Sequence, residues 1–231
     1  MKFIVVAGTP GAGKTSILLH AIKELKIRKH KPSVVKIDCI QTDDKRRYER
    51  EGIPVKVGIS ADMCPDHYSI YNIDDMLAWC KGDMLIMETA GLCLRCAPYT
   101  DKCLAVCVID TTCGPNTPLK IGPLLTTADV VVTTKGDLVS QAEREVFREK
   151  IYEVNPKCRV VESNGLSGMG AAELVDIICS VPECVILSNM VLRHTPPLAI
   201  CTLCTGEKRT SKSVHSGVLR NIDGFEEYDG E

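Results

Sequence analysis

The chain has 231 residues, of which 45% are hydrophobic and 25% are charged, a composition typical of a globular protein with one large domain. Its net charge of −2 and aromatic content of 4% argue against nucleic acid as the main partner, because they leave neither a cationic surface nor many stacking residues. No stretch reaches the roughly 18 apolar residues of a membrane span, and the apolar start "MKFIVVAG" is too short for a signal peptide. We therefore expect a cytoplasmic protein with no membrane partner.

Apolar, β-branched runs alternate with helical patterns along most of the chain. Strands are predicted at 3–8, 33–38, 83–90, 103–110, 129–134 and 158–163. Helices are predicted at about 14–29, 72–80, 118–127, 140–154 and 170–180. Because continuous apolar strands between helices are typical of buried parallel sheets, the predicted fold class is α/β, with a mostly parallel sheet covered by helices on both faces.

The segment "GTPGAGKT", residues 8–15, matches the P-loop pattern G-x-x-x-x-G-K-[ST] between a predicted strand and a predicted helix. Its glycines let the backbone wrap a phosphate, Lys14 can reach the β- and γ-phosphates, and the Thr15 hydroxyl can bind Mg²⁺. A glycine-rich turn without a ligand is the alternative, and both flanking elements disfavour it. The residues expected at the nucleotide are Gly8, Gly11, Ala12, Gly13, Lys14, Thr15 and Ser16, with Lys14 also catalytic.

Carboxylates follow the second and third predicted strands. Asp38, Asp43 and Asp44 lie in "KIDCIQTDDKRR", and Glu88 lies in "ETAG". Because ligands bind at the carboxyl edge of parallel strands, these side chains are candidates for contact with Mg²⁺ or with an attacking water. We expect Asp38 and Glu88 to serve Mg²⁺ and catalysis, and Gly91 to sense the γ-phosphate.

The segment "TTKGD", residues 133–137, fits the [NT]KxD pattern at the end of a strand. A carboxylate at its last position accepts hydrogen bonds from both N1–H and N2–H₂ of guanine. Adenine has no such pair of donors, so Asp137 favours GTP, with Lys135 in the same motif. Ser163 and Asn164, in "SNGLSGMG", are expected beside the base.

These stretches resemble the nickel-insertion GTPases of hydrogenase and urease maturation, the HypB/UreG-like family within the SIMIBI class of P-loop proteins. The resemblance runs from about residue 3 to residue 180. It is carried by the P-loop, "DCIQTDD", "CPDH" at 64–67, and "ETAG…VIDTTCGPNTPLKIGPLLTTADVVVTTKGDL". It implies a P-loop GTPase domain over 1–188, a homodimer controlled by GTP, and a client metalloenzyme as partner.

In that family a Cys-Pro-His or Cys-His element binds nickel at a dimer interface. By resemblance, Cys64 and His67 would be the ligands. The sequence has Cys-Pro-Asp-His at this place, and the cysteines after Gly91 are outside the family's pattern. The cargo therefore stays open between nickel, zinc and a [4Fe-4S] cluster.

The chain has thirteen cysteines, which are not expected to form disulfides in a reducing compartment. Cys93 and Cys96, in "CLRC", have the spacing with which two thiolates bind one metal, and one such pair per subunit would supply four at a two-fold seam. Cys103 is either a further ligand or part of the core. Alternatively, Cys93 and Cys96 join Cys201 and Cys204 in a tetrathiolate zinc site.

The alternation of strands and helices fails after about residue 189. Residues 189–231 are rich in Pro, Gly and mixed charge and contain "CTLC", so they are predicted to form a C-terminal extension. Its CxxC pair is interpreted as a metal knuckle or a redox pair.

Two functions remain open. The first is a GTP-hydrolysing metallochaperone that binds a transition metal or an iron–sulfur cluster through cysteines and assists maturation of a metalloenzyme. The second is a nucleotide-gated iron–sulfur electron carrier or reductase of the same P-loop class. The cysteine-rich loop favours the second function, but such reductases usually carry a lysine directly after the first P-loop glycine, where this chain has Thr9.

Overall fold

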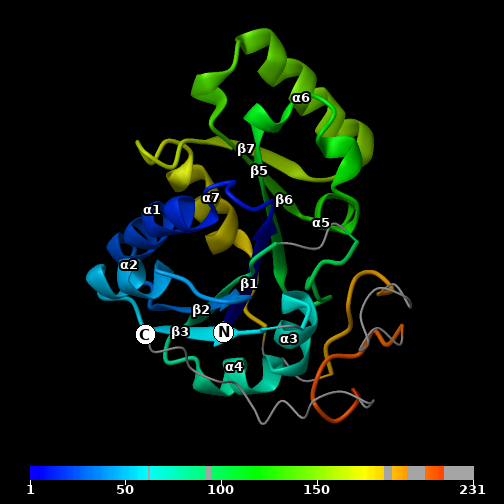
Figure 1. Ribbon diagram of the computed structural model, residues 1–231. Coiled ribbons are helices and arrows are strands. Elements are labelled where there is room, and N and C mark those ends of the chain that lie inside the picture. Colours follow the sequence, from blue (N-terminus) through cyan, green and yellow to red (C-terminus); the bar gives the residue numbers. More distant parts are fainter. Residues whose placement is uncertain (62, 92–94, 185–188, 197–205, 216–231) are drawn as a thin grey trace.

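The computed structural model describes residues 1–61, 63–91, 95–184, 189–196 and 206–215. At its centre is a seven-stranded sheet in the order β3-β2-β4-β1-β5-β6-β7, with every neighbouring pair of strands parallel (Figure 1). The strands are β1 (Lys2–Gly8), β2 (Pro32–Asp38), β3 (Val55–Ile59), β4 (Met84–Glu88), β5 (Leu104–Asp110), β6 (Val130–Thr134) and β7 (Arg159–Ser163). The parallel sheet confirms the predicted α/β class.

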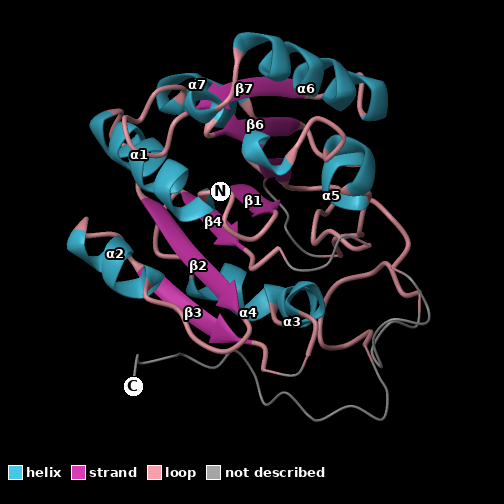
Figure 2. Ribbon diagram, turned by 45° about the horizontal axis from the view of Figure 1, so that its top comes forward, coloured by secondary structure: helices cyan, strands magenta, loops and turns pink. Residues whose placement is uncertain are grey.

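Helices cover both faces of the sheet, as predicted (Figure 2). One face carries α1 (Lys14–Ile27), α2 (Asp44–Arg50) and α7 (Ala171–Ser180). The other carries α3 (Pro65–Tyr71), α4 (Ile73–Trp79), α5 (Pro123–Thr126) and α6 (Gln141–Val154). Short 3-10 turns are η1 (Thr111–Cys113), η2 (Pro118–Lys120) and η3 (Gly136–Leu138). Within the described part of the chain, no helix is both long and apolar enough to cross a membrane.

The central strands are unbroken apolar runs because both of their faces are buried. In β1, Phe3 and Val5 belong to the core under α3 to α6, whereas Ile4 and Val6 belong to the core under α1, α2 and α7. All seven residues of β1 are buried, as are all seven of β5. This arrangement is typical of parallel sheets with helices on both faces.

The sequence pattern does not predict β3, α2 or α3. The edge strand β3 reads "VKVGI", an alternation of only five residues, and α2 reads "DKRRYER" with Tyr48 as its buried side chain and no hydrophobic period. The helix predicted at 118–127 is interrupted. Its first part is the turn η2, and α5 begins at Pro123 after Gly122, which has a φ of 60°.

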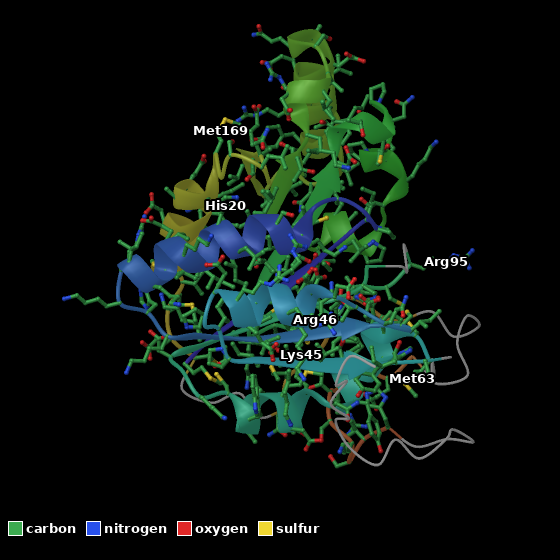
Figure 3. The ribbon with its side chains drawn as sticks, turned by 60° about the vertical axis from the view of Figure 1, so that its left-hand side comes forward. His20, Lys45, Arg46, Met63, Arg95 and Met169 are labelled. Carbon is green, nitrogen blue, oxygen red and sulfur yellow. The ribbon has the colours of Figure 1, made fainter. Side chains whose placement is uncertain are left out.

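The connection from β4 to β5 passes across β1, because the sheet places β1 between those two strands. Ala97 and Tyr99 of this connection lie in the core. The Tyr99 hydroxyl donates to the carbonyl of Val106 on β5 at 3.0 Å. Arg95, in contrast, is exposed and projects away from the body of the molecule (Figure 3). Most connections between parallel strands pack against the sheet through a helix. In this connection the buried side chain of Tyr99 makes such a contact with the sheet.

The described parts of the C-terminal extension pack against the domain, beside α3 and the β4–β5 connection (Figure 1). Leu192 forms an antiparallel bridge with Thr100, and Val191 forms another with Arg209. The regular alternation of strands and helices ends earlier, at Ser180 of α7. The described residues of the extension thus pack on the surface of the sheet domain.

Arg193 ties the extension to the domain. Its guanidinium donates to both carboxylate oxygens of Asp129 at 2.8 Å. It also donates to the carbonyls of Thr100 at 2.8 Å, Cys103 at 2.7 Å and Thr127 at 2.9 Å. Bidentate pairs of this kind are among the stronger hydrogen-bonded contacts in proteins.

Candidate functional site

The P-loop joins β1 to α1 at the carboxyl edge of the sheet. Gly11 and Gly13 have φ angles of 73° and 84°, in the left-handed region that glycine adopts without strain. Gly91, with a φ of 71°, lies so close to the loop that a Cβ there would stand 1.7 Å from the carbonyl oxygen of Gly8. The chain after β4 therefore packs backbone to backbone on the P-loop, and only glycine fits at position 91.

The side chain of Lys14 turns back over the P-loop. Its ammonium donates to the carbonyls of Gly8 at 3.2 Å, Thr9 at 3.1 Å and Ala90 at 3.3 Å. Burial lowers the pKa of Lys14, and the attraction of Glu88 offsets this only in part. The hydroxyl of Thr9 is buried and has no hydrogen-bond partner within the described residues. The loop thus offers a cation and a free hydroxyl to an anion.

Thr15, Glu88 and Asp44 bring oxygen ligands together beside the loop. The Thr15 hydroxyl lies 2.7 Å from Oε1 of Glu88 and 2.9 Å from Oδ2 of Asp44. Glu88 is fully buried, and the Tyr48 hydroxyl donates to its Oε2 at 2.6 Å. Burial raises the pKa of Asp44, but the charge of Lys36 and the hydrogen bond from Thr15 outweigh it, so the pKa is lowered. Asp44 is therefore held ionised beside the hydroxyl.

Lys36 supplies positive charge to this cluster. It pairs in register with Glu88 across β2 and β4, and its ammonium lies 2.9 Å from Glu88 and 3.1 Å from Asp44. Burial lowers the pKa of Lys36, but Glu88 and Asp44 outweigh it and raise the pKa above its ordinary value. Lys36 is absent from the predicted site residues, although the period of two in "SVVKID" places it on the same face as Val34, toward α1 and α2.

Asp38, the carboxylate predicted for Mg²⁺ at the end of β2, borders the same cavity of about 360 Å³. Its Oδ2 lies 3.9 Å from the Lys36 ammonium, and its Oδ1 accepts from the backbone N–H of Cys39 at 2.9 Å. Asp44, rather than Asp38, accepts the hydrogen bond of the Thr15 hydroxyl. The sequence prediction chose Asp38, whereas the carboxylate in contact with the Thr15 hydroxyl is that of Asp44, which is not among the predicted ligands.

Arg47 of α2 closes one side of this cavity. Its guanidinium donates to Asp44 at 2.9 Å and to the hydroxyl of Ser16 at 3.0 Å. Ala12 is fully buried, and its carbonyl accepts from the hydroxyl of Thr134 on β6 at 2.8 Å. The cavity borders the predicted P-loop residues Gly11, Gly13, Lys14, Thr15 and Ser16.

The residues predicted for the base lie at the carboxyl ends of β6 and β7. Asn164 donates to Oδ1 of Asp137 at 3.0 Å. Together with Ser163, these side chains border a cavity of about 190 Å³. Lys135 adopts a φ of 58°, and its ammonium pairs with Asp110 at 2.5 Å. The "TTKGD" segment and the last loop therefore meet, as the base-binding prediction requires.

The loop at 164–169 is held against α1. Nε2 of His20 lies 3.2 Å from the carbonyl oxygen of Gly165, and a Cβ at Gly168 would stand 2.6 Å from the same ring. Figure 3 shows His20 on α1 and Met169 in the loop. Because α1 starts in the P-loop, the phosphate and base sides of the site share one helix.

Cys64 and His67 open α3. Cys64 is its N-cap residue and His67 lies in its first turn, so the two stand on one side of a helix rather than in the loop before it. His67 is buried, as is the neighbouring Asp66. The ring of His67 lies edge-on to that of His215, with 6.5 Å between their centroids. The C-terminal extension therefore reaches the element expected to bind nickel.

Cys96 and Cys103 are both buried. The sulfur of Cys103 accepts from the backbone N–H of Thr100 at 3.3 Å and donates to its carbonyl at 3.4 Å. Burial raises the pKa of Cys103 to about 11. Metal binding needs the thiolate, which this surrounding disfavours. For Cys103 the structure favours the core interpretation over the metal role.

The remaining predicted thiolate ligands, Cys93, Cys201 and Cys204, lie outside the described residues. Among the residues that the structure does describe, no group of three or more His, Cys, Asp or Glu side chains is arranged to hold a metal ion. The ligands of the transition metal therefore stay predictions.

The chain is similar to known proteins over most of its length. The CobW/HypB/UreG nucleotide-binding domain family matches residues 2–162. An uncharacterized protein of Methanocaldococcus jannaschii is 60% identical over 233 residues, covering 100% of both chains. The urease accessory protein UreG of Edwardsiella ictaluri is 29% identical over 77% of this chain and 94% of its own. The hydrogenase maturation factor HypB of Azotobacter chroococcum is 29% identical over 73% of this chain and 56% of its own.

Solved structures share the fold. HypB from Archaeoglobus fulgidus superposes with a TM-score of 0.66 at 21% identity, over 78% of this chain and 89% of its own. HypB from Helicobacter pylori, solved in complex with nickel, gives a TM-score of 0.62 at 19% identity, over 78% of this chain and 86% of its own. The common part is the P-loop domain architecture.

Proposed function

Because the chain belongs to the CobW/HypB/UreG family of nucleotide-binding domains, we propose that it binds and hydrolyses GTP with Mg²⁺ and serves as a metallochaperone for a metalloenzyme. The observation that carries the proposal is the P-loop at the carboxyl edge of a parallel sheet, with Lys14, Thr15 and Glu88 gathered on it. Two relatives are a urease accessory protein and a hydrogenase maturation factor, and this similarity supports the proposed metallochaperone role.

The oxygen ligands beside the P-loop fit Mg²⁺. The Thr15 hydroxyl and the carboxylates of Glu88 and Asp44 are hard donors, and the Lys36 ammonium already lies among them as a stand-in cation. Asp38 borders the same cavity outside this cluster, and we propose that it serves the waters of the ion. A bound Mg²⁺ would neutralise charge on the β- and γ-phosphates.

The protein side chains divide the work of the proposed reaction. Lys14 exchanges its carbonyl partners, such as Gly8, for phosphate oxygens, which replaces dipoles by full charges. Glu88 orients the attacking water, while the hydrogen bond from Tyr48 keeps the carboxylate in place. Gly91, packed on Gly8, would carry the state of the γ-phosphate to the β4–β5 connection.

We infer that the base is guanine. Asp137 would accept from the two donors of the guanine edge, with Asn164 holding one oxygen of its carboxylate in place. Lys135 and Ser163 complete the proposed base site. Selection of GTP over ATP would then depend on one carboxylate.

The metal cargo is proposed to bind at the seam of a homodimer. Cys64, His67, Cys93 and Cys96 are the proposed ligands, and nickel, zinc or a [4Fe-4S] cluster is the proposed cargo. One CxxC pair per subunit supplies four thiolates across a two-fold axis. The pair at 201–204 is the alternative set.

The nucleotide part is tested by hydrolysis assays. Wild type should turn over GTP and not ATP. Lys14→Ala should abolish turnover, because the phosphate charge loses its main cation. Turnover of ATP at a rate similar to GTP would contradict the guanine assignment.

The metal part is tested with the double variant Cys93→Ala, Cys96→Ala, with Cys113→Ala at an exposed cysteine as control. The double variant should lose bound metal and GTP-dependent dimerisation, and the control should keep both. A double variant that keeps both would transfer the role to the 201–204 pair or to Cys64 and His67. Spectra of anaerobically purified protein decide the cargo, since a broad band near about 400 nm that bleaches on reduction indicates an iron–sulfur cluster.

A further inference from the structure

Lys36 stands where a divalent cation would meet its ligands. Its ammonium approaches Oε1 of Glu88 and Oδ2 of Asp44, at 2.9 and 3.1 Å. The Thr15 hydroxyl lies against the same two oxygens, at 2.7 and 2.9 Å. A single cluster of oxygens therefore faces both the lysine and the P-loop threonine.

The lysine has little freedom to leave this cluster. Only 4% of its surface is exposed, and it lies opposite Glu88 in the register of β2 and β4. Backbone pairing in the sheet thus fixes the position of the Lys36 Cα, and burial keeps the Lys36 ammonium from reaching solvent. A buried ammonium without its carboxylates would be strongly destabilised.

We propose that Lys36 is a built-in cation that makes divalent-metal binding at the P-loop conditional on nucleotide. Without nucleotide, the acidic side chains already have a positive partner at their shared oxygens, and an entering dication is repelled by it. A nucleoside triphosphate adds about four negative charges and its own oxygen ligands. Together these offset the charges of the Lys36 ammonium and of the dication.

This inference rests on the proposed nucleotide and Mg²⁺ site and adds its regulation. The repulsion acts on any dication, so it also keeps the transition-metal cargo away from the oxygen ligands of the GTPase site while that site is empty.

The test measures binding of Mn²⁺, as a paramagnetic probe for Mg²⁺, by electron paramagnetic resonance. Wild type without nucleotide should bind Mn²⁺ weakly at this site, and Lys36→Met should bind it at least about tenfold more tightly. Lys36→Arg, which keeps the charge, should resemble wild type. Lys2→Met is the matched control, because Lys2 is a buried strand lysine that bonds to the carbonyls of Ile178 and Cys179.

A thermal measurement covers the case in which the variant is poorly folded. Lys36→Met should be destabilised and then rescued by Mg²⁺ alone, whereas wild type should need nucleotide as well. Lys36→Gln removes the charge but keeps a hydrogen-bond donor, and it should show the same gain in Mn²⁺ affinity if the methionine variant does not fold.

Equal Mn²⁺ affinities for wild type and the neutral variants without nucleotide would overturn the proposal. Wild type is also titrated with GTP present. If wild type binds Mn²⁺ in the presence of GTP but the neutral variants show no gain without nucleotide, only the proposed role of Lys36 is refuted, and the proposed nucleotide site stands. If wild type with GTP binds no Mn²⁺, the proposed nucleotide site itself is wrong.

Discussion

Thr15 and Glu88, which are 73 positions apart, are joined by a hydrogen bond of 2.7 Å from the hydroxyl to the carboxylate. The bond spans β1's P-loop and the end of β4, two neighbouring strands of the sheet. The P-loop threonine proposed for Mg²⁺ is thus linked directly to the proposed catalytic carboxylate.

Glu88→Gln should lower kcat for GTP by about a hundredfold and leave nucleotide affinity largely intact. The amide keeps the shape of the side chain but loses the charge that orients the attacking water. Steady-state kinetics and binding of a fluorescent GTP analogue separate the two effects. An unchanged kcat would remove Glu88 from the reaction.

Asp137→Asn should weaken GTP binding by at least about tenfold, because the amide presents a donor to guanine's own donors. Binding of xanthosine triphosphate should suffer less, since its 2-oxo group accepts. Competition titrations with both nucleotides measure the difference. Asn164→Ala is a comparison variant: it removes the donor to Asp137 and the acceptor of the Leu166 and Ser167 N–H groups without changing the Asp137 carboxylate, so it should weaken both nucleotides alike. Parallel losses in the Asp137 variant would refute guanine recognition by this carboxylate.

Two buried thiols should make the protein less stable in alkali. Burial raises the pKa of Cys103 to about 11 and that of Cys107 to about 12, from an ordinary value of 9.0. Between these limits the unfolded chain releases protons that the folded chain keeps. The free energy of unfolding is therefore unaffected by these thiols below about pH 9. Above that pH, up to the folded-state pKa, it falls by about 1.4 kcal/mol per pH unit for each thiol.

Urea unfolding at about pH 8 and about pH 10 measures this loss. The double variant Cys103→Ala, Cys107→Ala should start less stable but decline less steeply. Burial also raises the pKa values of Tyr48 and Tyr99, and Cys107 and Cys103 add to the shift of Tyr99, so the difference in slope reports the thiols together with their effect on Tyr99. Identical slopes would show that these cysteines ionise normally.

Arg193→Ala should destabilise the protein by about 2–3 kcal/mol, because it removes the donor to Oδ1 of Asp129 and to several backbone carbonyls. Limited proteolysis should then cut first within residues 189–215. Arg28→Ala is the matched control, since Arg28 also bonds to carboxylates, Glu24 and Asp176, but at the surface. A control as damaging as Arg193→Ala would show that the extension does not depend on this contact.

The parts of the fold that follow from local pattern could be predicted. The strand predicted at 33–38 is Pro32–Asp38, and the helix predicted at 140–154 is Gln141–Val154. In the second case Ser140 and Glu143 form a capping box, a start signal that depends only on neighbouring residues. Buried parallel strands are likewise visible as apolar runs.

The choice among site residues could not be predicted, because it depends on an element that the pattern hides. Of Asp38, Asp43 and Asp44, the sequence analysis predicts Asp38 for Mg²⁺, whereas α2 places Asp44 beside Thr15. That helix is short and polar, so no hydrophobic period marks it. The sequence pattern also does not predict Lys36 as a site residue. Its pairing with Glu88 depends on the order of strands in the sheet, and the pattern within one strand does not reveal that order.

The connection between β4 and β5 has both of its ends fixed beside β1, where Glu88 pairs with Val6 and Leu104 pairs with Ile4. Between those two anchor points Gly91 packs on the P-loop and Tyr99 lies in the core, whereas Arg95 is exposed and can change without altering the sheet. A substitution at an exposed position of this connection should therefore be tolerated during evolution, whereas one at Gly91 would displace the P-loop.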